Sequence, residues 1–224
     1  MKRILIILLF SFLATMSFAQ KFKAGLIAGF ANTDVYGTDP QDVDFNKIGF
    51  NFGAFVGLPL SEKSDIRFEM TFVEKGSYIP PPSDSTSVAN GVFSSYRLRL
   101  NYINVPIIYS HKFSFNMGKT LVDKFAYEAG VNIGFLIHSD EDFNQQGPQP
   151  VFSQPPFSAY SRYDFGALLG FSFRISDDLK FHFRYENSIL PIRPHPGGAT
   201  SYYAGYYNSG QTNMAFIYTL SYTF

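Results

Sequence analysis

Residues 163–186 read YDFGALLGFSFRISDDLKFHFRYE, and their alternation decides the fold. From Tyr163 to Ile175 the odd positions are apolar, and most of the even positions hold glycine, serine or a charged residue. After Ser176-Asp177-Asp178 the alternation resumes, with apolar residues at odd positions and charged residues or histidine at even ones. A period of two puts these sets on opposite faces of a strand. The stretch therefore predicts a β-hairpin with a short polar turn.

The aromatic content indicates where such a hairpin lies. The chain has 26 Phe and 15 Tyr among 224 residues, yet its mean hydropathy is −0.03, so apolar and polar residues are interleaved. An apolar face opposite a glycine-rich, charged face is typical of a barrel in lipid, apolar outside and polar inside. A soluble barrel of the lipocalin type is the alternative, but it needs a polar outer face. If the apolar face of this chain were turned into the barrel, its charged residues would lie outside together with about half of its glycines.

The same alternation recurs along the chain and predicts eight strands, each long enough to cross a bilayer when tilted. Their connections alternate between long and short, as in bacterial outer-membrane barrels with long outer loops and short periplasmic turns. We therefore predict an all-β fold, an eight-stranded antiparallel up-and-down transmembrane β-barrel with both termini in the periplasm. The expected strands are about 21–31, 48–58, 65–75, 96–112, 124–138, 163–175, 179–186 and 213–224.

The fourth expected strand is irregular. Its apolar residues stand at even positions up to Tyr102 and at odd positions from Ile103 onward, and Pro106 interrupts the run. We expect a bulge near Tyr102 that switches the face of the strand. The alternative is that its upper part projects beyond the bilayer, where facing is unconstrained. Residues 111–123, which follow, form the longest of the expected inner turns.

The N-terminus predicts export. Lys2 and Arg3 precede an apolar run, and Ser17-Phe18-Ala19 has the small-x-small pattern of a cleavage site. We predict a cleaved signal peptide at 1–19 and an outer-membrane β-barrel domain at 20–224. An uncleaved anchor is the alternative, but the apolar run is shorter than the roughly 20 residues that a spanning helix needs.

Composition excludes several classes of function. The net charge is +0, which gives no electrostatic basis for binding nucleic acid. Cysteine is absent, so disulfides, thiolate metal sites and cysteine nucleophiles are excluded. The sequence has no glycine-rich phosphate loop, zinc-ligand spacing or dinucleotide fingerprint. We expect no catalytic residues, no cofactor and no metal.

Several stretches resemble the PorT-like outer-membrane β-barrel family of Bacteroidota. The run from Tyr102 to Ile108 is similar to that family's Tyr-Leu-Glu-Ile-Pro-Leu-Leu segment, with Asn104 in place of the acidic residue. The resemblance implies an outer-membrane barrel; some members assist secretion, and most have no assigned activity. Further similar stretches are Ala129 to Leu136, Tyr163 to Gly166, Arg184-Tyr185 and Asn213 to Phe224.

Inward-facing charges are the first candidate site. The interior of an eight-stranded barrel is only wide enough to be filled by side chains, which disfavours a diffusion pore. Charges at similar depth would pair there, because unpaired buried charges cost several kcal/mol each. We predict a lumen network whose role is packing or, alternatively, a proton or ion path. Its members are Arg67, Glu69, Glu128, Arg184 and Glu186.

The outer loops hold the second candidate site. Tyrosines among small flexible residues are typical of adaptable recognition surfaces, although a packing or girdle role is the alternative. These tyrosines are Tyr202, Tyr203, Tyr206 and Tyr207. A third stretch places His138 and Ser139 beside Asp140-Glu141-Asp142, at an expected outer rim. It leaves a lipid-modifying enzyme or a divalent-ion site as minor alternatives.

These observations predict a non-enzymatic outer-membrane barrel that acts through its extracellular loops or through envelope partners. Secretion assistance and envelope integrity are the roles considered, with outer-membrane lipid and secretion-machinery or other envelope proteins as partners. The alternative is a small-solute or ion channel of the outer membrane. A channel should carry stable current that Glu128 or Arg184 substitutions change, whereas a partner-binding barrel should not.

Overall fold

The computed structural model describes residues 22–37, 44–81, 95–117, 120–144, 159–194 and 210–224. These residues form eight strands. They are β1 (Lys23–Tyr36), β2 (Lys47–Pro59), β3 (Ser64–Ile79), β4 (Ser95–Met117), β5 (Thr120–Asn144), β6 (Tyr163–Arg174), β7 (Leu179–Ser188) and β8 (Thr212–Thr223). No helix in these ranges is long and apolar enough to cross a membrane.

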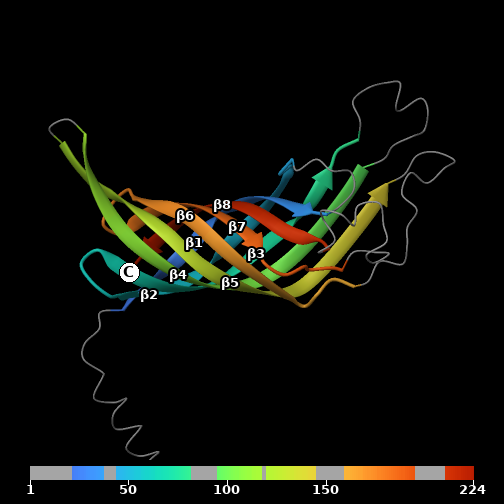
Figure 1. Ribbon diagram of the computed structural model, residues 1–224, viewed down its shortest axis with the longest axis horizontal. Coiled ribbons are helices and arrows are strands. Elements are labelled where there is room, and N and C mark those ends of the chain that lie inside the picture. Colours follow the sequence, from blue (N-terminus) through green and yellow to red (C-terminus); the bar gives the residue numbers. More distant parts are fainter. Residues whose placement is uncertain (1–21, 38–43, 82–94, 118–119, 145–158, 195–209) are drawn as a thin grey trace, which may run out of the picture.

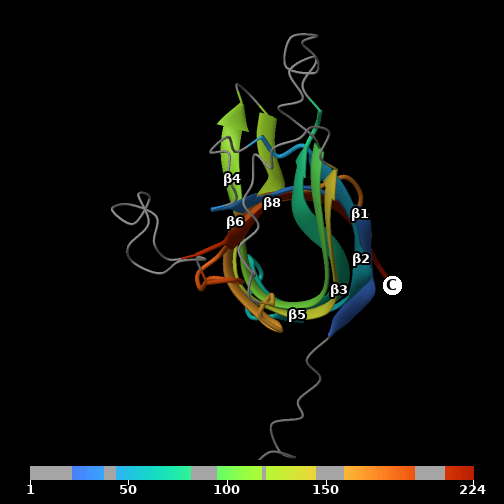
Figure 2. The ribbon, with the colours of Figure 1, turned by 90° about the vertical axis from the view of Figure 1, so that its right-hand side faces the viewer.

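The strands close into one barrel in sequence order. Each strand pairs antiparallel with the next, and β1 pairs with β8 from Gly25↔Thr223 to Tyr36↔Thr212. Figure 2 shows the resulting ring, and Figure 1 shows the tilted strands from the side. The predicted fold, an all-β up-and-down barrel, is therefore confirmed.

Both ends of the described chain lie at the end of the barrel that carries the short turns. Phe224 donates its backbone N–H to the carbonyl of Ala24, and Thr223 donates to Asp178 in the β6–β7 turn. The long connections between strands all leave from the opposite end, called here the outer end (Figure 1).

The two faces of the barrel differ as the period-two pattern predicts. Outward side chains are apolar and exposed, among them Phe50, which is 70% exposed, and Leu169, which is 66% exposed. Aromatic rings pair along this face; Phe52 and Phe72, for example, stack with centroids 5.1 Å apart. Inward positions are buried and mostly polar or glycine. This arrangement is the one expected of a barrel whose outer face contacts lipid.

The interpretation of β4 was wrong in one respect. Its even residues face the lumen along the strand, so Leu98, Leu100 and Tyr102 lie inside with 0% exposure, and β4 does not switch face. The irregularity belongs to β5: Asn101 pairs with His138 and Tyr102 with Leu136, which leaves one extra residue on β5. The physical reason is that the outer end of the lumen is apolar, so hydrophobicity there does not mark the lipid face.

Parts of two expected loops are strand instead. Residues 111–117 continue β4 and residues 120–123 continue β5, so the long inner turn is mostly a ribbon that Figure 1 shows extending past the other strands. Asp140-Glu141-Asp142 belongs to β5, where its residues alternate between faces. His138 and Ser139, adjacent on the same strand, point to opposite faces and do not form one constellation.

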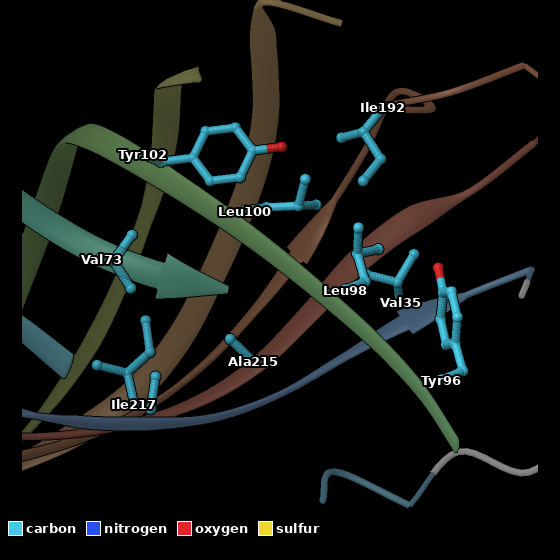
Figure 3. Close-up of a cluster of buried hydrophobic side chains, with 10 residues drawn as sticks. Val35, Val73, Tyr96, Leu98, Leu100, Tyr102, Ile192, Ala215 and Ile217 are labelled. Atoms are coloured by element: carbon cyan, nitrogen blue, oxygen red, sulfur yellow. The ribbon is translucent and has the colours of Figure 1, made fainter. Parts of the chain in front are cut away.

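An apolar cap fills the outer end of the lumen. Figure 3 shows Tyr96, Leu98, Leu100 and Tyr102 in a row along β4, with Ile192 on a separate segment nearby. Burying this set removes apolar surface from water and closes the barrel toward its outer end. The members of the apolar cap are Ala31, Val35, Val73, Tyr96, Leu98, Leu100, Tyr102, Ile192, Ala215 and Ile217.

Candidate functional site

The inner half of the lumen holds a hydrogen-bonded set that we call the arginine network. Its centre is Arg184 on β7, which donates to both Glu69 carboxylate oxygens at 2.8 and 2.9 Å. The same guanidinium donates through Nε to Glu128 at 2.6 Å. Two parallel bonds from a guanidinium to a carboxylate fix its orientation as well as its charge. The members of the arginine network are Arg67, Glu69, Glu128, His182, Arg184 and Ser221.

His182 links the network to β8. Its Nε2 lies 3.1 Å from Arg67 Nη1, and because a guanidinium can only donate, Nε2 is the acceptor. Its Nδ1 lies 2.8 Å from Glu128 Oε1, and because a carboxylate can only accept, Nδ1 carries the proton and donates to it in preference to accepting from Arg184 Nη2 at 3.4 Å. Ser221 Oγ lies 2.8 Å from Nε2 and serves as a second donor. In this neutral tautomer His182 adds no charge, so the two arginines balance the two glutamates.

A glycine makes room for the central arginine. Gly170 on β6 pairs directly with Arg184 on β7. A Cβ at position 170 would lie 2.2 Å from the Phe183 carbonyl oxygen and 2.9 Å from Arg184 Cγ. The inward glycine is thus required by the close approach of the neighbouring strand and of Arg184 itself.

A second set, the lysine cluster, lies beside the arginine network. Lys75 Nζ on β3 contacts Glu186 Oε1 at 2.5 Å and Asp164 Oδ2 at 3.1 Å. The side chains of all three are at most 4% exposed. Asn132 donates to Glu186 at 2.9 Å, and Asn213 donates to Asp164 at 2.8 Å. The lysine cluster consists of Lys75, Asp164, Glu186, Asn104, Asn132, Ser188 and Asn213.

The structure brings together four of the five charged residues expected in the lumen. Arg67, Glu69, Glu128 and Arg184 contact one another, but Glu186 bonds to Lys75 in the lysine cluster instead. The expectation of one network was wrong on this point. The period of two separates inward from outward residues but does not fix the register of strands that face each other across the lumen.

Sequence reasoning did not assign the other eight members of the two sets, and four of these are His182, Ser221, Lys75 and Asp164. All four stand at inward positions of their strands, so the alternation that found the arginines could have found them. The loop tyrosines Tyr202, Tyr203, Tyr206 and Tyr207 lie outside the described residues, as does the expected signal peptide at 1–19.

Residues 189–194, which we call the strap, follow β7 at the outer end of the barrel and place Ile192 in the apolar cap. Arg193 donates to both oxygens of Glu141 at 3.1 and 2.7 Å, and its guanidinium lies 3.5 Å from the centre of the Tyr160 ring. Burial and the nearby Glu141 carboxylate raise the pKa of Tyr160, which keeps its hydroxyl protonated as a donor. Backbone bonds join Ile192 to Ser161 and Gln211. These contacts hold the strap against the apolar cap.

Two solved structures match the chain at low sequence identity and with TM-scores below 0.5. The attachment invasion locus protein Ail of Yersinia pestis, solved with the heparin analogue sucrose octasulfate, is 9% identical with a TM-score of 0.44, and the match covers 91% of this chain and 99% of that one. The Neisserial surface protein A is 11% identical with a TM-score of 0.45, covering 91% and 97%. No curated protein matches the sequence.

The family assignment comes from the sequence itself. Residues 18–192 match the model of the family described as outer membrane protein beta-barrel domain. That match spans more than half of the 224 residues. It agrees with the closed eight-stranded barrel and its apolar outer face. The chain therefore belongs to the family of outer membrane protein beta-barrel domains, and its outer band of Phe, Leu, Ile and Val faces the lipid of an outer membrane.

Proposed function

We propose that this protein is a non-enzymatic, non-conducting outer-membrane barrel that acts through its extracellular segments on a partner in the cell envelope. The observation that carries the proposal is the filling of the lumen. The arginine network, the lysine cluster and the apolar cap follow one another along the barrel interior, and most of their members are less than 5% exposed. We infer that a barrel whose lumen is filled with side chains acts through its surface and not by conducting solutes.

The chemistry of the filling argues against the channel alternative. An ion entering from outside would have to pass the apolar cap, whose hydrocarbon side chains do not replace its hydration. It would then have to break hydrogen bonds between Arg184, Glu69 and Glu128, each of which is buried and already paired. Removing one partner from such a set is strongly unfavourable. The same pairing favours a packing role for the arginine network over a proton or ion path.

Contacts at the outer end of the barrel fix the ends of two long connections. The strap fixes the start of the fourth long connection through the Arg193–Glu141 pair, and Ser161, which ends the third connection, bonds to the strap. A fixed base lowers the conformational entropy that a loop loses on binding. The tyrosines at 202, 203, 206 and 207 belong to the fourth connection. We propose that they form the recognition surface.

Two further parts of the proposal concern orientation and relatives. We propose that residues 1–19 are a cleaved export signal and that both termini of the barrel are periplasmic, as the short turns at that end suggest. The resemblance to the PorT-like barrels of Bacteroidota favours assistance to secretion as the role, with envelope integrity as the second candidate.

Cross-linking in native outer membranes tests the proposal. A tagged wild-type chain and a variant with Tyr202, Tyr203, Tyr206 and Tyr207 replaced by serine are cross-linked, and the captured proteins are identified by mass spectrometry. We expect wild type to enrich secretion-machinery or other envelope components that the variant loses at equal abundance. Equal capture by both chains would contradict the proposal that these tyrosines form the recognition surface. Enrichment of nothing beyond abundant bystanders would contradict the proposal that the barrel acts on a partner.

A further inference from the structure

Arg67, at an inward position of β3, leaves part of its guanidinium without an acceptor. The guanidinium carbon lies 4.3 Å from the centre of the Phe55 ring, and Nη1 lies 3.1 Å from His182 Nε2 and 3.4 Å from Glu69 Oε1. Among the described residues, Nε and Nη2 have no hydrogen-bond acceptor, although Arg67 is 4% exposed. Neither atom is fully enclosed, so a small ligand can reach them. These two N–H groups form one edge of the guanidinium, and such an edge binds two oxygens of an oxyanion in parallel.

Lys180, at an inward position of β7, is a second cation without an acceptor. It is half-buried, and its Nζ atom has no hydrogen-bond or ion-pair partner in the described part of the chain. The charge that acts on it most strongly is that of Arg67, which is also positive, and Lys23 on β1 adds a further positive charge nearby. Arg174 stands directly opposite Lys180 on β6. Like charges in a cross-strand pair repel each other, so this gathering of cations lowers the stability of the barrel unless an anion joins it.

Cations outnumber carboxylates at the inward positions of this end of the barrel, called here the inner end. Alternation along the strands assigns three described carboxylates to these positions, and two of them, Glu69 and Glu128, already bond to Arg184. The third is Asp65, whose charge also acts on Lys180. The cations at inward positions are Lys23, Arg67, Lys112, Lys124, Arg174, Lys180 and Arg184.

Neighbouring groups do not remove this excess of positive charge. The lysine cluster, with one ammonium and two carboxylates, offsets a single positive charge from deeper in the lumen. The acidic groups of the turns and of the C-terminus are exposed, so water and salt screen their charges. These acidic groups are the side chains of Glu62, Asp177 and Asp178 and the terminal carboxylate of Phe224.

We propose that Arg67 and Lys180 bind one doubly charged oxyanion, inorganic phosphate or a phosphate monoester. The open edge of Arg67 bonds two oxygens of the anion, and Lys180 bonds a third. A phosphate monoester carries about −1.5 to −2 charge at pH 7, which matches the two cations that lack acceptors, whereas a carboxylate would match one of them. Because both side chains face the lumen, the ligand enters from the water at the inner end and not from the lipid. The site goes beyond the proposed function and does not depend on it, since the proposed partner contacts the outer end.

Thermal unfolding in defined anions tests the site. The purified full chain is refolded into micelles of an uncharged detergent, and its unfolding midpoint is measured by circular dichroism in sodium chloride, acetate, phosphate or glycerol phosphate at constant ionic strength and pH. We expect the midpoint to rise in phosphate relative to chloride, by about 3–5 °C for each tenfold increase in phosphate above the dissociation constant. Acetate should leave the midpoint at its chloride value. A rise in inorganic phosphate alone identifies the free anion as the ligand, and a rise in glycerol phosphate as well identifies phosphate monoesters.

Three variants separate the site from the general stabilisation that phosphate gives by exclusion from protein surfaces. Lys180→Gln removes a cation that has no acceptor and stands opposite Arg174, so in chloride its midpoint should equal or exceed that of wild type, while the site-specific rise in phosphate is lost. Lys63→Gln is the matched control, because it removes the same charge from the exposed β2–β3 turn and should keep the full rise. Arg67→Lys keeps the charge but loses the paired donors, and should raise the dissociation constant for phosphate about tenfold.

Four results would overturn the proposal. The first is a wild-type midpoint that is equal in phosphate and chloride, and the second is a rise in phosphate that Lys180→Gln shows in full, which would be the general salt effect. The third is a rise in acetate as large as that in phosphate, which would assign the cations to the carboxylates of an acidic peptide. The fourth is a midpoint of Lys180→Gln in chloride below that of wild type, which would mean that a group of the protein already pairs with Lys180.

Discussion

Arg184 and Glu69 are joined across the lumen by two parallel hydrogen bonds of 2.8 and 2.9 Å, although β7 and β3 are not neighbours in the barrel. The third bond of Arg184, to Glu128 on β5, ties a third strand to the same guanidinium. Backbone pairing joins each strand only to its two neighbours. The arginine network therefore supplies cross-links through the interior that the barrel wall cannot provide.

Arg184→Ala should be strongly destabilising. It leaves Glu69 and Glu128 buried without their main partner, and breaking a buried pair in this way costs about 3–5 kcal/mol. Arg184→Lys should lie between wild type and alanine, because an ammonium keeps the charge but cannot make the two parallel bonds. Urea unfolding of the barrel in lipid vesicles measures these differences.

Arg99→Ala is the control for this series, since Arg99 pairs with Asp140 and Asp142 at exposed positions of the outer end. Exposed pairs of this kind contribute at most about 1 kcal/mol. If Arg184→Ala and Arg99→Ala lowered the free energy of unfolding equally, the arginine network would not stabilise the barrel.

Leu100→Ala tests whether the apolar cap is a true core. Leu100 is fully buried in the lumen, so truncation should leave a cavity and cost about 2–5 kcal/mol. Leu169→Ala changes the same side chain on the outer face, where lipid fills the space, and should cost much less. Unfolding midpoints of the two variants in the same vesicles give the comparison. A larger drop in the unfolding midpoint for Leu169→Ala than for Leu100→Ala would mean that Leu100 faces the lipid and not the lumen.

Arg193→Ala should loosen the strap without unfolding the barrel. The substitution removes both bonds to Glu141 and the contact with the Tyr160 ring. Amide hydrogen exchange of residues 189–194 should become faster, while exchange in the middle of β6 and β7 stays unchanged. Arg99→Ala again serves as control, and a strap that exchanges equally fast in wild type and Arg193→Ala would show that the pair does not hold it.

The sequence was sufficient to predict the barrel fold and part of the side-chain set inside the lumen. The period of two between Tyr163 and Glu186 predicts the β6–β7 hairpin, and the same phase puts Arg67, Glu69, Glu128 and Arg184 inside. Each of these inferences depends only on which face of one strand a residue occupies. Local alternation records that information directly.

Other features depend on contacts between distant strands and could not be predicted in this way. Leu98 and Leu100 are as apolar as lipid-facing residues, so only the closed barrel shows that they fill an apolar part of the lumen. The extra residue on β5 lies between Leu136 and His138, and a run of apolar residues gives no signal of it. The pairing of Glu186 with Lys75 depends on the stagger between β7 and β3, which neither strand records in its own sequence.

Single-channel recording from the purified protein in planar bilayers tests the central claim, a barrel whose interior is filled. The account predicts no stable current for the wild-type chain, and none for Glu128→Gln, because the apolar cap still closes the outer end in that variant. A steady, ion-selective current from the wild-type protein that changes with Glu128→Gln or Arg184→Lys would contradict the account and establish a channel.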